Sequence, residues 1–124
     1  MRLLMRNLGI FLDDERVPSD VTWIDYPTNI EWIVVRDYVG FTKAIEEHHS
    51  DSLLISFDHD LQDFDACGEE RKGMHCIRWL GEYCMDNGLK MPTCLFHSKN
   101  IPGRENMQSY YLNAVKNINC QGDK

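Results

Sequence analysis

The segment LGIFLDD, residues 8–14, decides the fold class, because an uninterrupted apolar run stops abruptly at two aspartates. Short apolar runs bounded by polar residues are typical of strands buried on both faces of a sheet. Similar runs occupy residues 32–35, 53–57 and 93–96, and the last two also end in polar clusters. We therefore predict four buried strands, three of which carry polar side chains at their carboxyl ends.

The segments between these runs predict the connections. Apolar residues recur at helical spacing in 38–48, 73–87 and 104–118, whereas 15–30 contains two prolines and has no helical period. Residues 62–72 are polar and are expected to form a loop. The resulting order is strand, loop, strand, helix, strand, helix, strand, helix. Such alternation favours a three-layer α/β fold with a mostly parallel sheet, in which a loop replaces the first helix.

Length and composition narrow the class of protein. The chain has 124 residues, of which 43% are hydrophobic and 27% charged, as expected for one globular domain spanning 1–124. No apolar run approaches the roughly 20 residues of a membrane helix. No secretory signal is recognisable at the start, so we expect a cytoplasmic protein without membrane association.

The charge and the cysteines exclude further classes. A formal net charge of −7 disfavours binding to duplex nucleic acid, which needs a basic face, but it permits a small anion in a local basic pocket. The five cysteines are odd in number and contain no CxxC pair, so neither a disulfide framework nor a structural zinc site is expected.

Carboxylates follow two of the predicted strands. Asp13 and Asp14 end the first, and Asp58 and Asp60 follow the third. The carboxyl ends of parallel strands share one edge of the sheet, where ligands bind in open α/β folds. Clustered carboxylates repel one another unless a cation or a proton lies among them. We therefore predict a divalent cation, Mg²⁺ or Mn²⁺, held by these four aspartates.

Histidines also follow these strands, and a turn rich in polar residues follows the last one. His59 and His97 are candidates for proton transfer together with Asp58, or for metal binding. The turn HSKNIPGRENM, residues 97–107, leads into a helix, whose N-terminus can bind an anion. A phosphate site is therefore expected at this turn.

Three of these segments together resemble one family. FLDDERVP (11–18), SFDHDL (56–61) and HSKNIPGRENM (97–107) are similar to the LDDxR, DHDL and HSxNxxGxxNM segments of the cyclic-phosphate-processing receiver-like family. The resemblance implies a flavodoxin-like, receiver-like fold and an acidic pocket that binds or processes cyclic phosphates or nucleotides. The residues that match its motifs and that it implies for substrate binding are Arg16, Ser98, Asn100, Gly103 and Asn106.

The residues leave three functions open. The first is a metal-dependent phosphodiesterase-like hydrolase acting on a cyclic nucleotide or a cyclic phosphate end. The second is a non-catalytic module that sequesters a nucleotide or inhibits a protein partner. The third is a receiver phosphorylated on Asp58, which is disfavoured because no receiver-type lysine can be assigned and because we expect a single domain without an output module.

Overall fold

The sheet is parallel throughout and has the predicted strands. The structure is a computed structural model that describes residues 7–50 and 52–119. Its main sheet has the order β2-β1-β3-β6. The strands are β1 (Asn7–Leu12), β2 (Ile30–Val35), β3 (Leu54–Phe57) and β6 (Thr93–Phe96).

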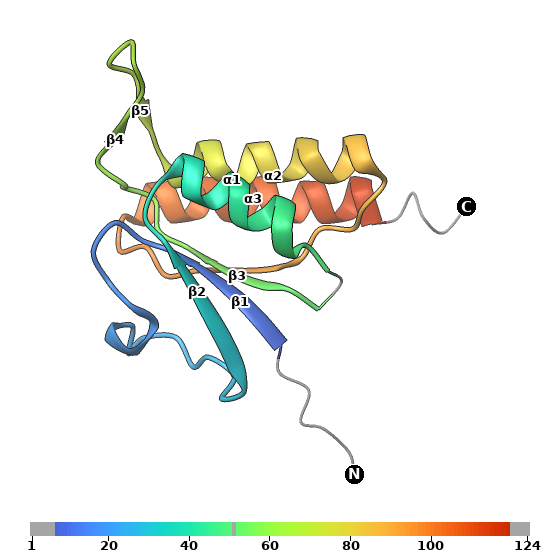
Figure 1. The fold of residues 1–124 in the computed structure, drawn as a ribbon, viewed down its shortest axis with the longest axis horizontal. Coiled ribbons are helices and arrows are strands. Elements are labelled where there is room, and N and C mark those ends of the chain that lie inside the picture. Colours follow the sequence, from blue (N-terminus) through green and yellow to red (C-terminus); the bar gives the residue numbers. More distant parts are fainter. Residues whose placement is uncertain (1–6, 51, 120–124) are drawn as a thin grey trace.

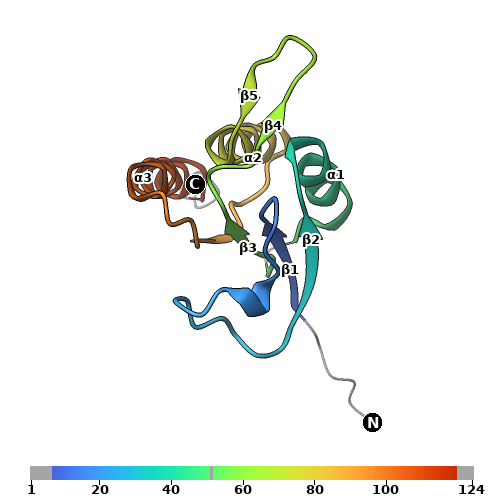
Figure 2. The same cartoon turned by 90° about the vertical axis from the view of Figure 1, so that its left-hand side faces the viewer.

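The three helices lie on one face of this sheet, as Figures 1 and 2 show. They are α1 (Tyr38–His48), α2 (Gly73–Asn87) and α3 (Ile101–Ile118). The connections from β2 to β3 and from β3 to β6 cross the sheet in one direction, so right-handed crossovers place α1 and α2 on the same face. The step from β1 to β2 runs in the other direction and therefore crosses the opposite face.

An irregular segment, residues 13–29, makes that step. It contains one short 3-10 helix, η1 (Pro18–Asp20), and no α-helix. Its Tyr26 and Trp23 side chains bond to residues of β3 and to the residue after β6, so the segment covers the sheet face that the helices leave free. The predicted fold class, including the loop in place of the first helix, is confirmed.

The core lies between the sheet and the helices. Ile10, Leu12, Ile55 and Phe57 from the central strands are fully buried against apolar side chains of all three helices. This burial explains why the strands read as uninterrupted apolar runs. None of the helices in the described part of the chain combines the length and the apolar character that crossing a bilayer requires.

Two local features differ from expectation. Helix α3 begins at Ile101 instead of residue 104, because the Asn100 side chain accepts a hydrogen bond from the Gly103 N–H and caps the helix. The polar segment 62–72 contains a short hairpin of β4 (Asp63–Phe64) and β5 (Glu70–Arg71). Strands of two residues are too short to show an alternation of apolar and polar residues in the sequence.

Candidate functional site

Three polar residues occupy equivalent positions at the carboxyl ends of β1, β3 and β6. The strand register pairs Leu12 with Phe57 and Phe57 with Phe96, so the next residues, Asp13, Asp58 and His97, follow in line. All three are buried, with relative exposures of 1%, 6% and 0%. One ligand atom from each lies within 4.8 Å of the others. The group therefore has the donor types and spacing to hold a metal ion.

Asp13 is saturated with hydrogen-bond donors. Its Oδ1 accepts the N–H groups of Glu15 and Arg16, both at 2.8 Å. Its Oδ2 accepts His97 Nε2 at 2.9 Å and the Arg16 guanidinium at 3.2 Å. Burial alone would raise the pKa of Asp13, but the bonds from His97, Arg16 and Glu15 outweigh it and hold the pKa well below its usual range. Asp13 is therefore a fixed negative charge.

Asp58 has the opposite environment. Among the described residues it accepts one hydrogen bond, from the His59 N–H at 2.9 Å. Burial, followed by the negative charge of Asp13, raises the pKa of Asp58 to about 7. Burial and the charges of Asp13 and Glu15 also raise the pKa of Asp14. The site thus holds more negative charge than its own donors can stabilise.

These carboxylates line an open cavity of about 210 Å³. It is bounded by Asp13, Asp14, Glu15, Arg16, Asp58, Asp60, Gln62, Ser98, Lys99 and Asn100. All four aspartates predicted to bind metal are among these residues, as are Arg16, Ser98 and Asn100 from the predicted substrate-binding set. Four other predicted site residues do not line it: His59, His97, Gly103 and Asn106.

His97 lies beneath the cavity, and both of its ring nitrogens have partners. Nε2 contacts Asp13, and Nδ1 lies 2.7 Å from Ser56 Oγ, which also bonds to the Tyr26 hydroxyl. The ring stacks on Phe11, with centroids 4.5 Å apart. Because ionised Asp13 can only accept, His97 donates from Nε2, and a neutral ring then accepts the Ser56 O–H at Nδ1. This arrangement makes His97 an orienting partner of Asp13.

His59 and Asp60 form a second cluster beside the cavity. His59 Nδ1 lies 3.0 Å from Asp60 Oδ1, and the Asn100 amide donates to Asp60 Oδ2 at 3.1 Å. Gly103 packs against the imidazole so closely that a Cβ there would lie 2.5 Å from His59 Cγ. Gly103 is therefore required for packing of His59, and Asn106 is exposed further along α3.

Sequence reasoning missed four residues that organise the site. Tyr26 and Ser56 complete the hydrogen-bond chain to His97, and Trp23 Nε1 donates to the His97 carbonyl at 3.0 Å. Arg36, just after β2, donates to the carbonyls of Asp13 and Arg16 at 3.2 and 2.7 Å. The one available signal was Ser56, a single hydroxyl within an apolar strand.

Comparison with protein families identifies the chain. The family model described as the cyclic-phosphate processing receiver domain matches residues 8–113, which run from β1 into α3. The chain therefore belongs to this family, as the three sequence motifs predicted. Comparisons with curated proteins and with solved structures gave no significant match.

Proposed function

We propose that this member of the cyclic-phosphate processing receiver family binds a small cyclic phosphate together with a divalent cation in its acidic cavity, and hydrolyses it. The observation that carries the proposal is Asp58, a buried carboxylate that lies beside the ionised Asp13 and has one hydrogen-bond donor among the described residues. A carboxylate in this environment is stabilised by a cation. The family to which the chain belongs supports a cyclic phosphate as the ligand.

The donor set fits a hard cation that prefers oxygen. Asp58 has an oxygen without a protein donor among the described residues, and Asp14 and Asp60 line the same cavity. Asp13 can join them if the Arg16 guanidinium leaves Oδ2. His97 could join Asp13 and Asp58 around an ion only by giving up its bond to Asp13 or to Ser56, and the remaining oxygen donors favour Mg²⁺ or Mn²⁺. When bound, such an ion polarises a phosphoryl oxygen and lowers the pKa of a bound water.

Cationic and polar groups from two loops are placed to hold the phosphate. Arg16 and Lys99 line the same cavity as the carboxylates, together with Ser98 and Asn100 at the start of α3. A guanidinium released from Asp13 would bind phosphate through two N–H groups, and the Lys99 ammonium would add a point charge. These residues neutralise ligand charge that the aspartates alone would repel.

The proposed reaction is ring opening by water. The water oxygen forms a bond to phosphorus, one ring P–O bond breaks, and the departing oxygen takes up a proton, which leaves a phosphomonoester and an alcohol. Among the described residues that line the cavity, the groups that can accept the water proton are the carboxylates of Asp14, Glu15, Asp58 and Asp60. The predicted catalytic roles of His59 and His97 remain proposals, with His97 acting through the orientation of Asp13.

One observation favours a second candidate function, binding without turnover. No histidine lines the cavity formed by the described residues, so the usual proton carrier at neutral pH does not face the ligand. The same cavity would then sequester a cyclic phosphate, with the same cation and the same cationic side chains.

Calorimetry and product analysis test both candidates. The purified protein is titrated with 2′,3′-cyclic AMP and 3′,5′-cyclic AMP in Mg²⁺, in Mn²⁺ and in EDTA, and the mixtures are analysed by ³¹P NMR. We expect cation-dependent binding that Asp58→Asn removes and that Asp86→Asn, on the exposed face of α2, retains. A phosphomonoester product supports hydrolysis, and binding without product supports sequestration. Binding that is absent, or unchanged in Asp58→Asn, contradicts the proposed site.

A further inference from the structure

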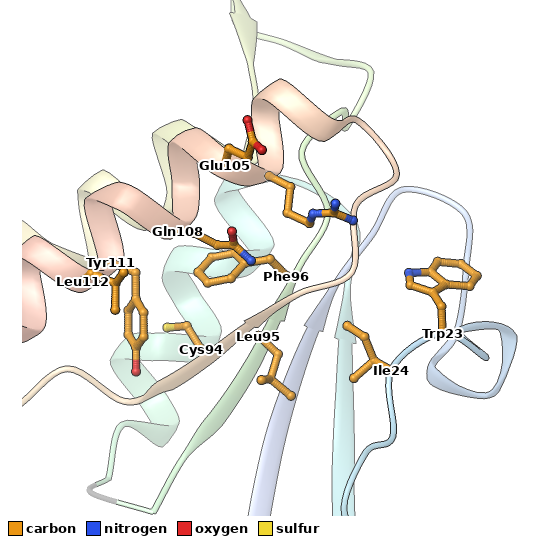
Figure 3. A pocket seen from close by; sticks show the side chains of 10 residues that line it. Trp23, Ile24, Cys94, Leu95, Phe96, Glu105, Gln108, Tyr111 and Leu112 are labelled. Carbon is orange, nitrogen blue, oxygen red and sulfur yellow. The ribbon is translucent and has the colours of Figure 1, made fainter.

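A second and larger cavity adjoins the acidic one. It is an open groove of about 600 Å³ between the irregular segment, β6 and α3 (Figure 3). Ile24 points from the irregular segment toward β6, where Leu95 and Phe96 line the groove. Polar side chains of α3, including Glu105 and Gln108, form its opposite wall. The groove thus combines an apolar surface with hydrogen-bonding groups along one side.

Trp23 stands at the boundary between the two cavities. It lines the groove, while its ring contacts two residues of the acidic cavity, with Lys99 Nζ 4.2 Å and Arg16 Cζ 5.5 Å from the ring centroid. The side chain is 39% exposed, yet its Nε1 donates to the His97 carbonyl at 3.0 Å. Trp23 is therefore a fixed, accessible aromatic surface beside the proposed phosphate position.

Unpaired cations surround this boundary in a chain of net charge −7. Among residues 7–50 and 52–119, neither Lys99 nor Arg104 forms an ion pair with a carboxylate. Arg104 lines the groove, and its guanidinium donates to the Ser98 carbonyl at 3.3 Å, on the turn that borders the acidic cavity. Positive charge beside an exposed aromatic ring suits a ligand that has both an anionic group and a flat ring.

We propose that the groove binds the base of a nucleotide whose phosphate occupies the acidic cavity. The proposal rests on the function proposed above and specifies its ligand as a nucleoside cyclic phosphate. The base stacks on Trp23 and covers Leu95, and its polar edge faces Gln108 on α3. Lys99, which is exposed, leaves the indole face and turns to the phosphate.

A matched pair of ligands isolates the contribution of the base. Affinities for 2′,3′-cyclic AMP and for methyl riboside 2′,3′-cyclic phosphate, which has no base, are measured in Mn²⁺ as the dissociation constant, or as KM where turnover occurs. Stacking on one aromatic side chain predicts that the nucleotide binds roughly 5- to 150-fold more tightly. Trp23→Ala should bring the ratio of the two affinities close to one, and because the ratio compares two ligands of the same variant, an effect of Trp23 on the phosphate site itself cancels.

Further variants guard against indirect effects. Trp23→Phe keeps an aromatic face and should retain part of the ratio, although it loses the bond to His97. Leu95→Glu adds charge to the groove without altering Trp23 and should also bring the ratio of the two affinities close to one. Phe64→Ala changes an exposed aromatic residue on the β4–β5 hairpin and should leave the ratio intact. Circular dichroism confirms that each variant is folded.

The outcomes separate the two proposals. Equal affinity of wild-type protein for both cyclic phosphates overturns the base site and leaves the phosphate site standing. A ratio that survives in both Trp23→Ala and Leu95→Glu places the base elsewhere and also overturns the inference. If neither compound binds in Mn²⁺, the proposed function fails, and the base site fails with it.

Discussion

Replacing Asp58 by asparagine should stabilise the metal-free protein at alkaline pH. Asparagine has the shape of aspartate and keeps an oxygen to accept the His59 N–H, but it removes the charge that burial and Asp13 oppose. The pKa of Asp58 is about 7 in the folded protein, whereas the ordinary pKa of an aspartate side chain is 3.8. This difference of about three pH units corresponds to a cost on the order of 4 kcal/mol when Asp58 is ionised.

The direction of the pH dependence follows from proton uptake. Below pH 4 the Asp58 carboxyl is protonated in both the folded and the unfolded chain, so it contributes no difference in stability. Between pH 4 and 7 the folded protein holds the proton and the unfolded chain has lost it, so the free energy of unfolding falls as pH rises. Above pH 7 Asp58 is ionised in both states, so its ionisation lowers the free energy of unfolding no further.

Urea unfolding between pH 4 and 8 in EDTA, followed by tryptophan fluorescence, measures this effect. Asp58→Asn should equal wild type near pH 4 and exceed it at pH 8 by up to about 4 kcal/mol. Asp86→Asn removes one carboxylate from the exposed face of α2 and should follow the wild-type curve. An Asp58→Asn curve parallel to that of wild type, or a variant less stable at pH 8, would refute the electrostatic account of the site.

Three further predictions concern the cation, the buried hydrogen bonds and the packing of His59. Saturating Mg²⁺ or Mn²⁺ should raise the melting temperature of wild type more at pH 8 than at pH 5 and should leave Asp58→Asn unchanged, because the ion competes with protons for that carboxylate; equal shifts in both proteins would contradict this. Ser56→Ala should lower the free energy of unfolding by about 1–3 kcal/mol in urea titrations, since it leaves the buried His97 Nδ1 without its partner. Gly103→Ala should cost about 1–3 kcal/mol by displacing the imidazole, and adding His59→Ala should recover most of that loss in a double-mutant cycle; additive losses would show that the two residues are not coupled.

The fold could be predicted because its strongest signals are local. Apolar runs mark strands buried on both faces, and the helical spacing within residues 38–48 and 73–87 identifies α1 and α2. The first residue of α3 was missed because Pro102 and Gly103 suggest a turn, whereas proline is well accommodated in the first turn of a helix. The β4–β5 hairpin was missed because its strands have two residues each.

The sequence predicted which side chains lie together where strand position alone decides it, and their roles stay predictions. Asp13 and Asp58 face the same cavity because each is the residue directly after a strand of the same sheet, in matched register. His97 has the same register, but its ring lies under Asp13, because Phe11 and Ser56 bind it from neighbouring strands. Which side chain reaches the cavity depends on contacts between strands that are distant in sequence.

The two buried aspartates also show why charge at this site cannot be inferred from motifs alone. Asp13 and Asp58 are equivalent in position, yet Asp13 accepts four hydrogen bonds and Asp58 accepts one among the described residues. Two of the four bonds to Asp13 come from backbone N–H groups in the turn after β1. Arg36 donates hydrogen bonds to two carbonyl oxygens of the same turn. This local difference in donors lowers one pKa and leaves the other raised.

The irregular segment 13–29 connects this charge to the rest of the molecule. Its Tyr26 hydroxyl bonds to Ser56, which in turn bonds to the His97 ring, and its Trp23 indole donates directly to the His97 carbonyl. His97 in turn holds the Asp13 carboxylate, which is the main negative charge acting on Asp58. The loop that replaces the first helix therefore helps to hold His97, the partner of Asp13, from the opposite face of the sheet, while the same Trp23 borders the groove proposed to bind the base.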